Sequence, residues 1–253
     1  MKFKQEIVLV TGSTRGIGKG IAEAFAKEGA KVIINGVSED RVKNTVLEFR
    51  ASGYDAYGAV FDVSNFNGTC KEIDRIKNDI GAITILVNNA GISPKKNNRK
   101  VLFKDMEYEE WSKVVDVNLN GVFNCSRAVI NDMIHANRGK IINISSAFAR
   151  YYSPISSSHY VTTKTAVLGI TRAISGETCM HGINCNAIAP GRAWTEMTIK
   201  QPKEVNDAFM ETIPVGEFAK VEDIAAVALF LASEEASYIH GATVDVNGGI
   251  CMI

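Results

Sequence analysis

Short runs of β-branched and aliphatic residues alternate along the chain with longer stretches in which apolar residues recur every three or four positions. This alternation predicts βαβ units, in which crossover helices join parallel strands. The expected strands are Ile7 to Val10, Lys31 to Asn35, Ala56 to Phe61, Ile83 to Val87, Lys140 to Ile144, Asn184 to Ile188 and Thr243 to Val246. The expected crossover helices are Ile17 to Glu28, Asp40 to Ala51, Thr69 to Asp79, Glu109 to His135, Tyr160 to His181 and Val221 to Ser233. No linker or repeat interrupts the pattern, so we predict one α/β domain over residues 1–253, with a doubly wound, parallel, seven-stranded sheet and helices on both faces.

Composition excludes several other classes of protein. The 253 residues carry 28 Lys and Arg against 28 Asp and Glu, and 46% are hydrophobic, so neither disorder nor a basic nucleic-acid surface is expected. No apolar run reaches the roughly 18 residues of a membrane span, and no signal peptide opens the chain, so we expect a cytoplasmic protein. Five cysteines without a C-x-x-C pair favour reduced thiols over a disulfide framework, and we expect no metal site.

A glycine-rich turn follows the first expected strand and opens the first expected helix. It reads Thr11-Gly12-Ser13-Thr14-Arg15-Gly16-Ile17-Gly18. In this position Gly12 permits a tight turn, Gly16 lets the backbone approach a pyrophosphate, and Gly18 allows close helix packing. The arrangement predicts a Rossmann-type dinucleotide site, whereas a glycine turn without a ligand is the simpler alternative.

The end of the second strand indicates which dinucleotide is preferred. A carboxylate there would accept a hydrogen bond from the ribose 2′-hydroxyl and repel a 2′-phosphate. The run Asn35-Gly36-Val37-Ser38 has none, while Arg15 and Ser38 are suitable donors to a phosphate. We therefore expect NADP(H) rather than NAD(H).

Tyr160 and Lys164 stand four residues apart, on one face of a helix. A cation about 4 Å from a phenol contributes roughly 4 kcal/mol at an effective dielectric of 20, or about three pKa units as an upper bound. The pair alone is also compatible with two surface residues. Other polar groups follow the fourth, fifth and sixth strands, however, and so fall on the same edge of the sheet.

Taken together, these motifs resemble the short-chain dehydrogenase/reductase family over essentially the whole chain. The matching segments are Thr11-Gly12-x-x-x-Gly16-x-Gly18, Asp62-Val63, Asn88-Asn89-Ala90-Gly91, Asn118, Ser146, Tyr160-x-x-x-Lys164, Pro190-Gly191-x-x-x-Thr195 and Val246-Asn247-Gly248-Gly249. The C-terminal segment looks most like bacterial 3-oxoacyl-acyl-carrier-protein reductases, although sugar, polyol and steroid dehydrogenases share this ending.

The resemblance implies a catalytic role for four residues. Tyr160 would act as general acid and base on a ketone and its secondary alcohol, and Ser146 would donate a hydrogen bond to the reacting oxygen. Lys164 would lower the Tyr160 pKa and hold the nicotinamide ribose, while Asn118 would anchor a water that relays protons. A protein that binds NADP(H) without turnover, as a sensor or scaffold, would have no physical need for this set.

The resemblance also implies the residues that contact the cofactor. Besides Tyr160 and Lys164 they are Gly12, Ser13, Thr14, Arg15, Gly16, Ile17, Gly18, Ser38, Asp62, Val63, Asn89, Ala90, Gly91, Pro190, Gly191 and Thr195. Asp62 and Val63 would meet the adenine, the segment Asn89 to Gly91 the adenosine ribose, and Thr195 the nicotinamide amide. A homotetramer is implied as well, with the helices Glu109 to His135 and Tyr160 to His181 in one interface and the C-terminal segment in another.

One spacing departs from the family. The interval from Ser146 to Tyr160 is fourteen residues instead of thirteen, which leaves Ser145 as a less favoured candidate for the serine. A hydrolase triad from Ser156 to Ser158 and His159 is an alternative, but adjacent residues on one turn rarely face each other.

The substrate is the least determined feature. The expected pocket residues are Ser93, Pro94, Phe148, Arg150, Tyr151, Tyr152, Ile155, Arg192, Ala193, Trp194 and Met197. They suit a small carbonyl or alcohol substrate with an apolar body and one anionic group, or equally a packed loop. The basic loop Ser93 to Lys104 is either a solvated face or a contact for an acidic acyl carrier protein or a charged substrate.

Overall fold

The computed structural model describes residues 1–97 and 99–253, apart from the side chain of Met197. Within these residues a single seven-stranded sheet forms, and all its strands are parallel. The strands are β1 (Ile7–Val10), β2 (Lys31–Gly36), β3 (Ala56–Val60), β4 (Ile85–Asn88), β5 (Gly139–Ile144), β6 (Ile183–Pro190) and β7 (Thr243–Val246). Their order across the sheet is β3-β2-β1-β4-β5-β6-β7. The predicted doubly wound architecture is confirmed.

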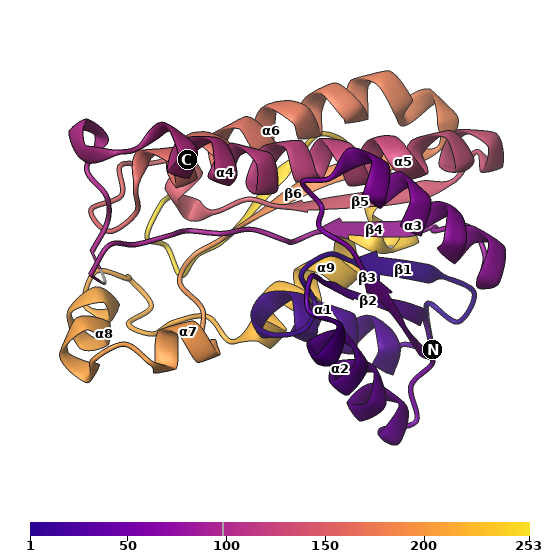
Figure 1. Cartoon of the computed structure of the whole chain (residues 1–253), viewed down its shortest axis with the longest axis horizontal. Helices are drawn as coiled ribbons and strands as arrows, with labels where there is room; N and C mark the ends of the chain where they lie inside the picture. The colour runs from indigo at the N-terminus through magenta and orange to yellow at the C-terminus, as the bar shows by residue number, and fades with distance from the viewer. Residues whose placement is uncertain (98) are drawn as a thin grey trace.

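Helices cover both faces of the sheet (Figure 1). One face carries α1 (Gly16–Lys27), α2 (Glu39–Ala51) and α9 (Val221–Ala232), and the other carries α3 (Phe66–Asp79), α4 (Tyr108–Val115), α5 (Gly121–Ala136) and α6 (Ser158–Thr178). Two short helices, α7 (Glu196–Ile199) and α8 (Lys203–Met210), lie apart from these layers. None of the helices in the described part of the chain combines the length and the hydropathy needed to cross a bilayer.

Each face of the sheet has its own apolar core. Ile21 and Phe25 of α1 pack with Leu231 of α9 on one side, and Ile76 of α3 and Met133 of α5 pack on the other. The central strands β1 and β4 are almost wholly buried, because both of their faces are covered. The chain reverses its direction of winding between these two strands, and open α/β sheets bind ligands at the carboxyl ends of strands at such a point.

One predicted helix contains an irregularity that was not predicted. The stretch Glu109 to His135 is helical throughout, and within it a π-helical turn at Asp116–Asn120 joins α4 to α5. A π turn adds one residue to the helical repeat and is often found at functional sites. It leaves the apolar periodicity on either side intact, so the pattern of hydrophobic residues gave no sign of it.

Candidate active site

The glycine turn brings the ends of β1 and β4 into close contact. Gly12 and Gly16 have φ angles of +64° and +56°, in the left-handed region that favours glycine. A Cβ on Gly12 would lie 2.9 Å from the Cα of Ala90, and a Cβ on Gly18 would lie 2.4 Å from Nδ2 of Asn89. The turn therefore has no room for a side chain at Gly12 or Gly18, and it leads into the N-terminus of α1, whose first N–H groups have no partner within the helix.

Asn35, at the end of β2, holds this turn from one side and was not predicted to belong to the site. Its Oδ1 accepts a hydrogen bond from the N–H of Gly12 at 3.0 Å. Its Nδ2 donates to the carbonyls of Ala59 and Phe61 at 3.2 and 3.1 Å. Ser13, predicted to contact the cofactor, is buried and its Oγ accepts from the N–H of Asn35.

Asn89 holds the turn from the other side. Its Nδ2 donates to the carbonyls of Thr11 and Gly12 at 2.9 and 3.2 Å, so the amide predicted to meet a ribose is bonded to the glycine turn. The backbone N–H groups of Asn89 and Ala90 both donate to Oγ1 of Thr11. Buried polar groups need such partners, and these bonds fix the turn before any ligand arrives.

The residues predicted to determine the preference for NADP(H) over NAD(H) lie at the N-termini of two helices. Arg15 is exposed at the N-cap of α1, and Ser38 is at the N-cap of α2, where its Oγ accepts from the N–H of Arg41. A Cβ on Gly36, at the end of β2, would lie 3.0 Å from Cγ2 of Thr14. Ile17, also predicted for the cofactor, packs its side chain against the core.

The segment after β3 is shaped by its own side chains. Oδ1 of Asp62 accepts from the N–H and the Oγ of Ser64, and Asp62 is exposed. Val63 is buried, and its carbonyl accepts from Nδ2 of Asn124 on α5 at 2.8 Å. These bonds hold Asp62 and Val63 just beyond the carboxyl end of their strand.

Ser146 and Tyr160 come together at the carboxyl end of β5. Burial raises the pKa of the Tyr160 phenol above its ordinary value, and a hydrogen bond with Ser146 lowers it. The Oγ of Ser146 also accepts from the N–H of Phe148 at 3.2 Å. Ser145, the less favoured candidate, is turned elsewhere, because its Oγ donates to the carbonyl of Lys164 at 2.7 Å.

Lys164 is buried next to this pair. Its Nζ donates to the carbonyl of Ile144 at 2.7 Å and lies 5.9 Å from the centre of the Tyr160 ring. Burial lowers the pKa of Lys164 to about 8. Burial is the largest influence on the Tyr160 pKa, and the charge of Lys164 is not among its causes.

Asn118 lies in the π turn and is fully buried. Its Oδ1 accepts from the N–H of Ile92 at 2.8 Å, and its Nδ2 donates to the carbonyl of Ile92 at 2.9 Å and to Oγ1 of Thr163 at 3.3 Å. A Cβ on Gly91 would lie 3.4 Å from both Oδ1 of Asn118 and Nζ of Lys164. Asn118 thus joins the loop after β4 to α6 at Thr163, the residue before Lys164.

The end of β6 approaches the glycine turn. A Cβ on Gly191, which follows Pro190, would lie 2.9 Å from the Cα of Asn247, and one on Gly16 would lie 3.6 Å from Cγ2 of Thr195. Thr195 is the N-cap of α7, where its Oγ1 accepts from the N–H of Thr198. The segments from β1 and β6 that were predicted to hold the two ends of a dinucleotide therefore face each other.

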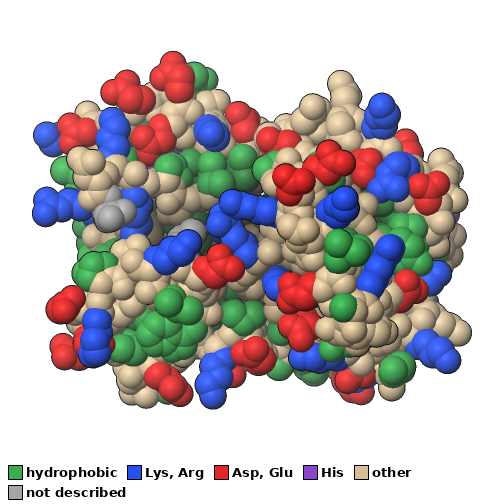
Figure 2. Space-filling view, turned by 60° about the horizontal axis from the view of Figure 1, so that its bottom comes forward, with side chains coloured by type: hydrophobic (Ala, Val, Ile, Leu, Met, Phe, Trp, Pro, Cys, Tyr) green, Lys and Arg blue, Asp and Glu red, His purple; other side chains and the backbone are tan. Residues whose placement is uncertain are grey.

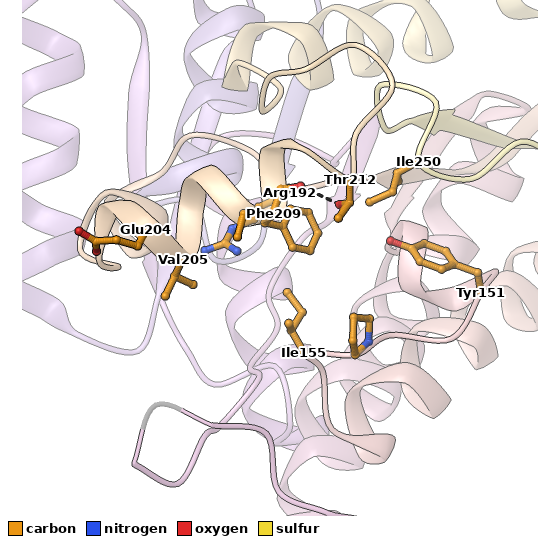
Figure 3. A pocket seen from close by; sticks show the side chains of 10 residues that line it. Tyr151, Ile155, Arg192, Glu204, Val205, Phe209, Thr212 and Ile250 are labelled. Atoms are coloured by element: carbon orange, nitrogen blue, oxygen red, sulfur yellow. Dashed lines mark hydrogen bonds between the residues drawn. The ribbon is translucent and has the colours of Figure 1, made fainter.

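A cavity of about 570 Å³ opens beside α8. It is lined by Tyr151, Pro154, Ile155, Arg192, Glu204, Val205, Ala208, Phe209, Thr212 and Ile250 (Figure 3). Of the predicted pocket residues, Tyr151, Ile155 and Arg192 line it. Phe148 packs against Phe209 and Tyr151 at its edge, with ring centres 6.4 and 5.5 Å apart.

The predicted pocket residues Trp194, Ser93 and Tyr152 are not among those that line the cavity. Trp194 packs on Phe218, with ring centres 4.8 Å apart, and Ser93 is half-buried in the loop after β4. Tyr152 is 78% exposed, and its hydroxyl accepts from Nζ of Lys100. The side chain of Met197 is outside the described part of the structure.

The basic loop is docked against the segment that precedes Tyr160. Nζ of Lys100 donates to the carbonyl of Ser153, and the N–H of Val101 donates to Oγ of Ser157, the N-cap residue of α6. His159 does not form a triad with the neighbouring serines, since its Nε2 lies 2.9 Å from Oε1 of Glu110 on α4. Asn98 of this loop is outside the described residues.

The arrangement fits a dinucleotide. Gly12, Gly16 and Gly91 present backbone without side chains, and a Cβ at these positions would lie close to neighbouring atoms or require an unfavourable φ angle. Ser146, Tyr160 and Lys164 provide hydroxyl, phenol and ammonium groups within one cluster. Such a set can donate and accept a proton at an oxygen next to a bound cofactor.

Comparison with known proteins agrees with this geometry. A family model described as enoyl-(acyl carrier protein) reductase matches residues 12–251. The 3-oxoacyl-[acyl-carrier-protein] reductase FabG of Staphylococcus epidermidis is 38% identical over 245 residues, which cover 96% of this chain and 98% of that protein.

Solved structures are similar along the whole chain. Two structures of a 3-oxoacyl-[acyl-carrier protein] reductase from Brucella melitensis, one of them with bound NAD, align with TM-scores of 0.96 and 0.94 at 39% identity, covering 100% of this chain and 93% of theirs. A gluconate 5-dehydrogenase from Burkholderia cenocepacia, in complex with NADP and tartrate, aligns with a TM-score of 0.91 at 34% identity, covering 98% of this chain and 96% of its own. The chain therefore belongs to the short-chain dehydrogenase/reductase family of NAD(P)-dependent oxidoreductases.

Proposed function

We propose that this chain, as one catalytic domain over residues 1–253, reduces the ketone of a 3-oxoacyl thioester to a secondary alcohol. The observation that carries the proposal is the cluster of Ser146, Tyr160 and Lys164 beside the glycine turn. Relatives that cover nearly the whole chain, and are named 3-oxoacyl-[acyl-carrier-protein] reductases, support the substrate class.

Each polar group has one task in this reaction. The reduced nicotinamide supplies hydride to the carbonyl carbon when it is bound. Tyr160 donates its phenolic proton to the carbonyl oxygen, and Ser146 positions that oxygen with a hydrogen bond. Lys164 stabilises the tyrosinate that remains, and Asn118 anchors the water through which the proton is replaced from solvent. The raised pKa of Tyr160 keeps the phenol protonated at neutral pH, as an acid must be.

The preferred cofactor is NADP(H). The end of β2 carries Asn35, bonded to the glycine turn, and Gly36, so no carboxylate stands there to repel a 2′-phosphate. Arg15 is exposed at the N-cap of α1, and Ser38 begins α2 on the neighbouring segment. An arginine suits a phosphate because its planar donors can form paired hydrogen bonds. The related structures hold NAD in one case and NADP in another, so the preference rests on these side chains.

A sugar-acid or polyol dehydrogenase is the second candidate. It is favoured by the gluconate 5-dehydrogenase structure and by the arginine in the cavity beside α8. A sensor or scaffold without turnover is disfavoured, since such a protein would not require the buried Lys164. An acyl carrier protein is the proposed macromolecular partner for the thioester.

The chain is proposed to form a homotetramer. Phe123 on α5 is 51% exposed, and Tyr238 after α9 is 99% exposed. β7 pairs with β6 alone within the described residues, so its outer edge has no strand beside it. These features lie on the two predicted interfaces, and exposed apolar patches of this kind favour association. Light scattering should give four times the 27.5 kDa chain mass; a monomer would exclude the proposal.

The experiment for the proposed function is the initial rate of acetoacetyl-coenzyme A reduction, measured with NADPH and NADH in parallel. We expect turnover at several per second, within the usual range for enzymes, and at least about tenfold higher kcat/KM with NADPH. Turnover with equal efficiency for both cofactors would contradict the cofactor proposal alone. Absence of turnover, in protein that binds NADPH, would overturn the thioester proposal in favour of the sugar-acid reaction.

A further inference from the structure

The cavity beside α8 contains an arginine without an acidic partner among the described residues. The guanidinium of Arg192 lies 5.1 and 5.0 Å from the ring centres of Phe209 and Phe218. Its hydrogen bond within the described structure is from one Nη to Oδ1 of Asn206 at 2.9 Å, and Nδ2 of Asn206 in turn donates to the carbonyl of Thr198. Because a guanidinium has five N–H donors, most of its donor capacity is available for a ligand.

The acidic residue that lines the same cavity does not neutralise this charge. Glu204 is on α8, and Figure 3 shows its carboxylate turned away from the Arg192 guanidinium, with no ion pair between them. Burial lowers the pKa of Arg192, as expected for a cation drawn away from water. Partial burial of the Arg192 guanidinium between aromatic rings and an amide costs desolvation free energy, and a bound anion would offset this cost.

Lys95, in the basic loop, is a second cation whose pKa is lowered by burial and by the charge of Arg192. No carboxylate forms an ion pair with Lys95 or Arg192 in residues 1–97 and 99–253. Figure 2 shows Lys and Arg side chains in the hollow across the middle of one face, with Asp and Glu side chains beside them. Two cations without an ion-paired carboxylate favour a negative group near them.

The cavity is one layer of side chains away from the catalytic serine. The N–H of Phe148 donates to Oγ of Ser146, and its ring packs on Phe209, which also carries the Arg192 guanidinium on its face. The rest of the lining is mostly apolar, including Ile155, Val205 and Ile250. A volume of about 570 Å³ is within the range of small-molecule sites.

We propose that Arg192 binds an oxyanion of the substrate in this cavity, so that the substrate carries an apolar segment ending in a carboxylate or a phosphate. This inference rests on the proposed function, because it assigns the part of the ketone substrate that lies away from the reacting carbon. Two kinds of substrate could carry such an oxyanion. A carboxylate would belong to an oxo acid, and a phosphate would belong to the pantetheine arm of an acyl carrier or coenzyme A.

Calorimetric titration of the NADP⁺-bound protein tests the site without requiring turnover. The probes are hexanoate, hexyl phosphate and neutral hexan-1-ol, which share one apolar chain. We expect one of the anions to bind at least about tenfold more tightly than the alcohol, which corresponds to about 1.4 kcal/mol. Preference for hexanoate would identify an oxo acid, and preference for hexyl phosphate would identify the phosphate source.

Two variants and one control assign the preference to Arg192. Arg192→Met keeps an apolar stem on the rings and should abolish the preference for the anion, whereas Arg192→Lys should retain part of it. Arg50→Met is the matched control, since the guanidinium of Arg50 on α2 lies 5.7 Å from the ring centre of Tyr57 on β3, and it should leave the preference unchanged. NADPH affinity measured by fluorescence should be the same in all four proteins.

Three results would overturn the inference. They are equal affinity of the unmodified protein for anion and alcohol, a preference that survives in folded Arg192→Met, and loss of NADPH affinity in both Arg192 variants, which would assign the guanidinium to the cofactor instead. Failure of the proposed function is distinguishable, because it would abolish acetoacetyl-coenzyme A reduction and leave the binding preference in place.

Discussion

Replacing Tyr160 with Phe should lower kcat for ketone reduction by on the order of 10³-fold, within the range of general acid catalysis, while NADPH affinity changes by less than about twofold. The substitution removes the only group that the proposed reaction uses to protonate the carbonyl oxygen. The ring remains, so the packing beside Lys164 is kept. Stopped-flow measurement of a single turnover separates this loss from any change in product release.

The matched control is Tyr57→Phe. Tyr57 is a partly buried tyrosine on β3, and removing its hydroxyl should leave kcat within about twofold. Ser146→Ala provides a second comparison, because it removes the hydrogen bond that lowers the Tyr160 pKa. Turnover of Tyr160→Phe near the rate of the unmodified protein would exclude Tyr160 as the proton donor.

The sheet could be predicted because its signal is local. The strands Ile7–Val10 and Thr243–Val246 have the predicted bounds, and the glycine turn lies between β1 and α1 as expected. Parallel strands with both faces covered must be continuously apolar, and that pattern is visible without any knowledge of neighbours. The polar residues that follow such strands necessarily gather at one edge, which is why the catalytic cluster could be placed.

The missed features depend on contacts between distant segments. Asn35 forms no pattern with its neighbours, and its role depends on the positions of Gly12 and Phe61 in other elements. The π turn around Asn118 is a one-residue change in winding that preserves the apolar face of each flanking helix. The wall of the cavity formed by Phe209 and Ile250 comes from segments whose sequence gives no sign that they meet.

The position of the Lys164 ammonium could not be predicted from the spacing of Tyr160 and Lys164 in the sequence. Tyr160 and Lys164 share a helix face, as their separation requires, but the ammonium is drawn to the carbonyl of Ile144. Spacing fixes the face of the helix and does not fix the rotamer of a long side chain. Burial then sets the direction of both pKa shifts, raising that of the phenol and lowering that of the lysine.

Replacing Lys164 with Met should separate activity from stability. We expect ketone reduction to fall by on the order of 10²-fold or more, since the tyrosinate loses its cation. We also expect the variant to be more stable than the unmodified protein at pH 7. The lysine is 5% exposed, and its pKa falls from 10.5 to about 8 on burial, so keeping it protonated in the folded state costs about 3 kcal/mol.

The pH dependence gives the sign of this effect. Between pH 8 and 10.5 the unfolded chain binds more protons at Lys164 than the folded chain, so the free energy of unfolding of the unmodified protein rises with pH in this window. Lys164→Met lacks this contribution, and its advantage should be present below pH 8 and disappear by pH 10.5. Loss of the hydrogen bond to Ile144 reduces the advantage by about 1 kcal/mol.

Denaturant unfolding at pH 7, 8, 9 and 10 measures this difference. Lys140→Met is the control, because Lys140 is also buried with its pKa lowered by burial, but it lies at the start of β5, away from the catalytic cluster. It should keep full activity. A Lys164→Met protein whose stability differs from that of the unmodified protein by the same amount at every pH would show that Lys164 is not held in the buried, charge-disfavouring position that the proposed catalytic site requires.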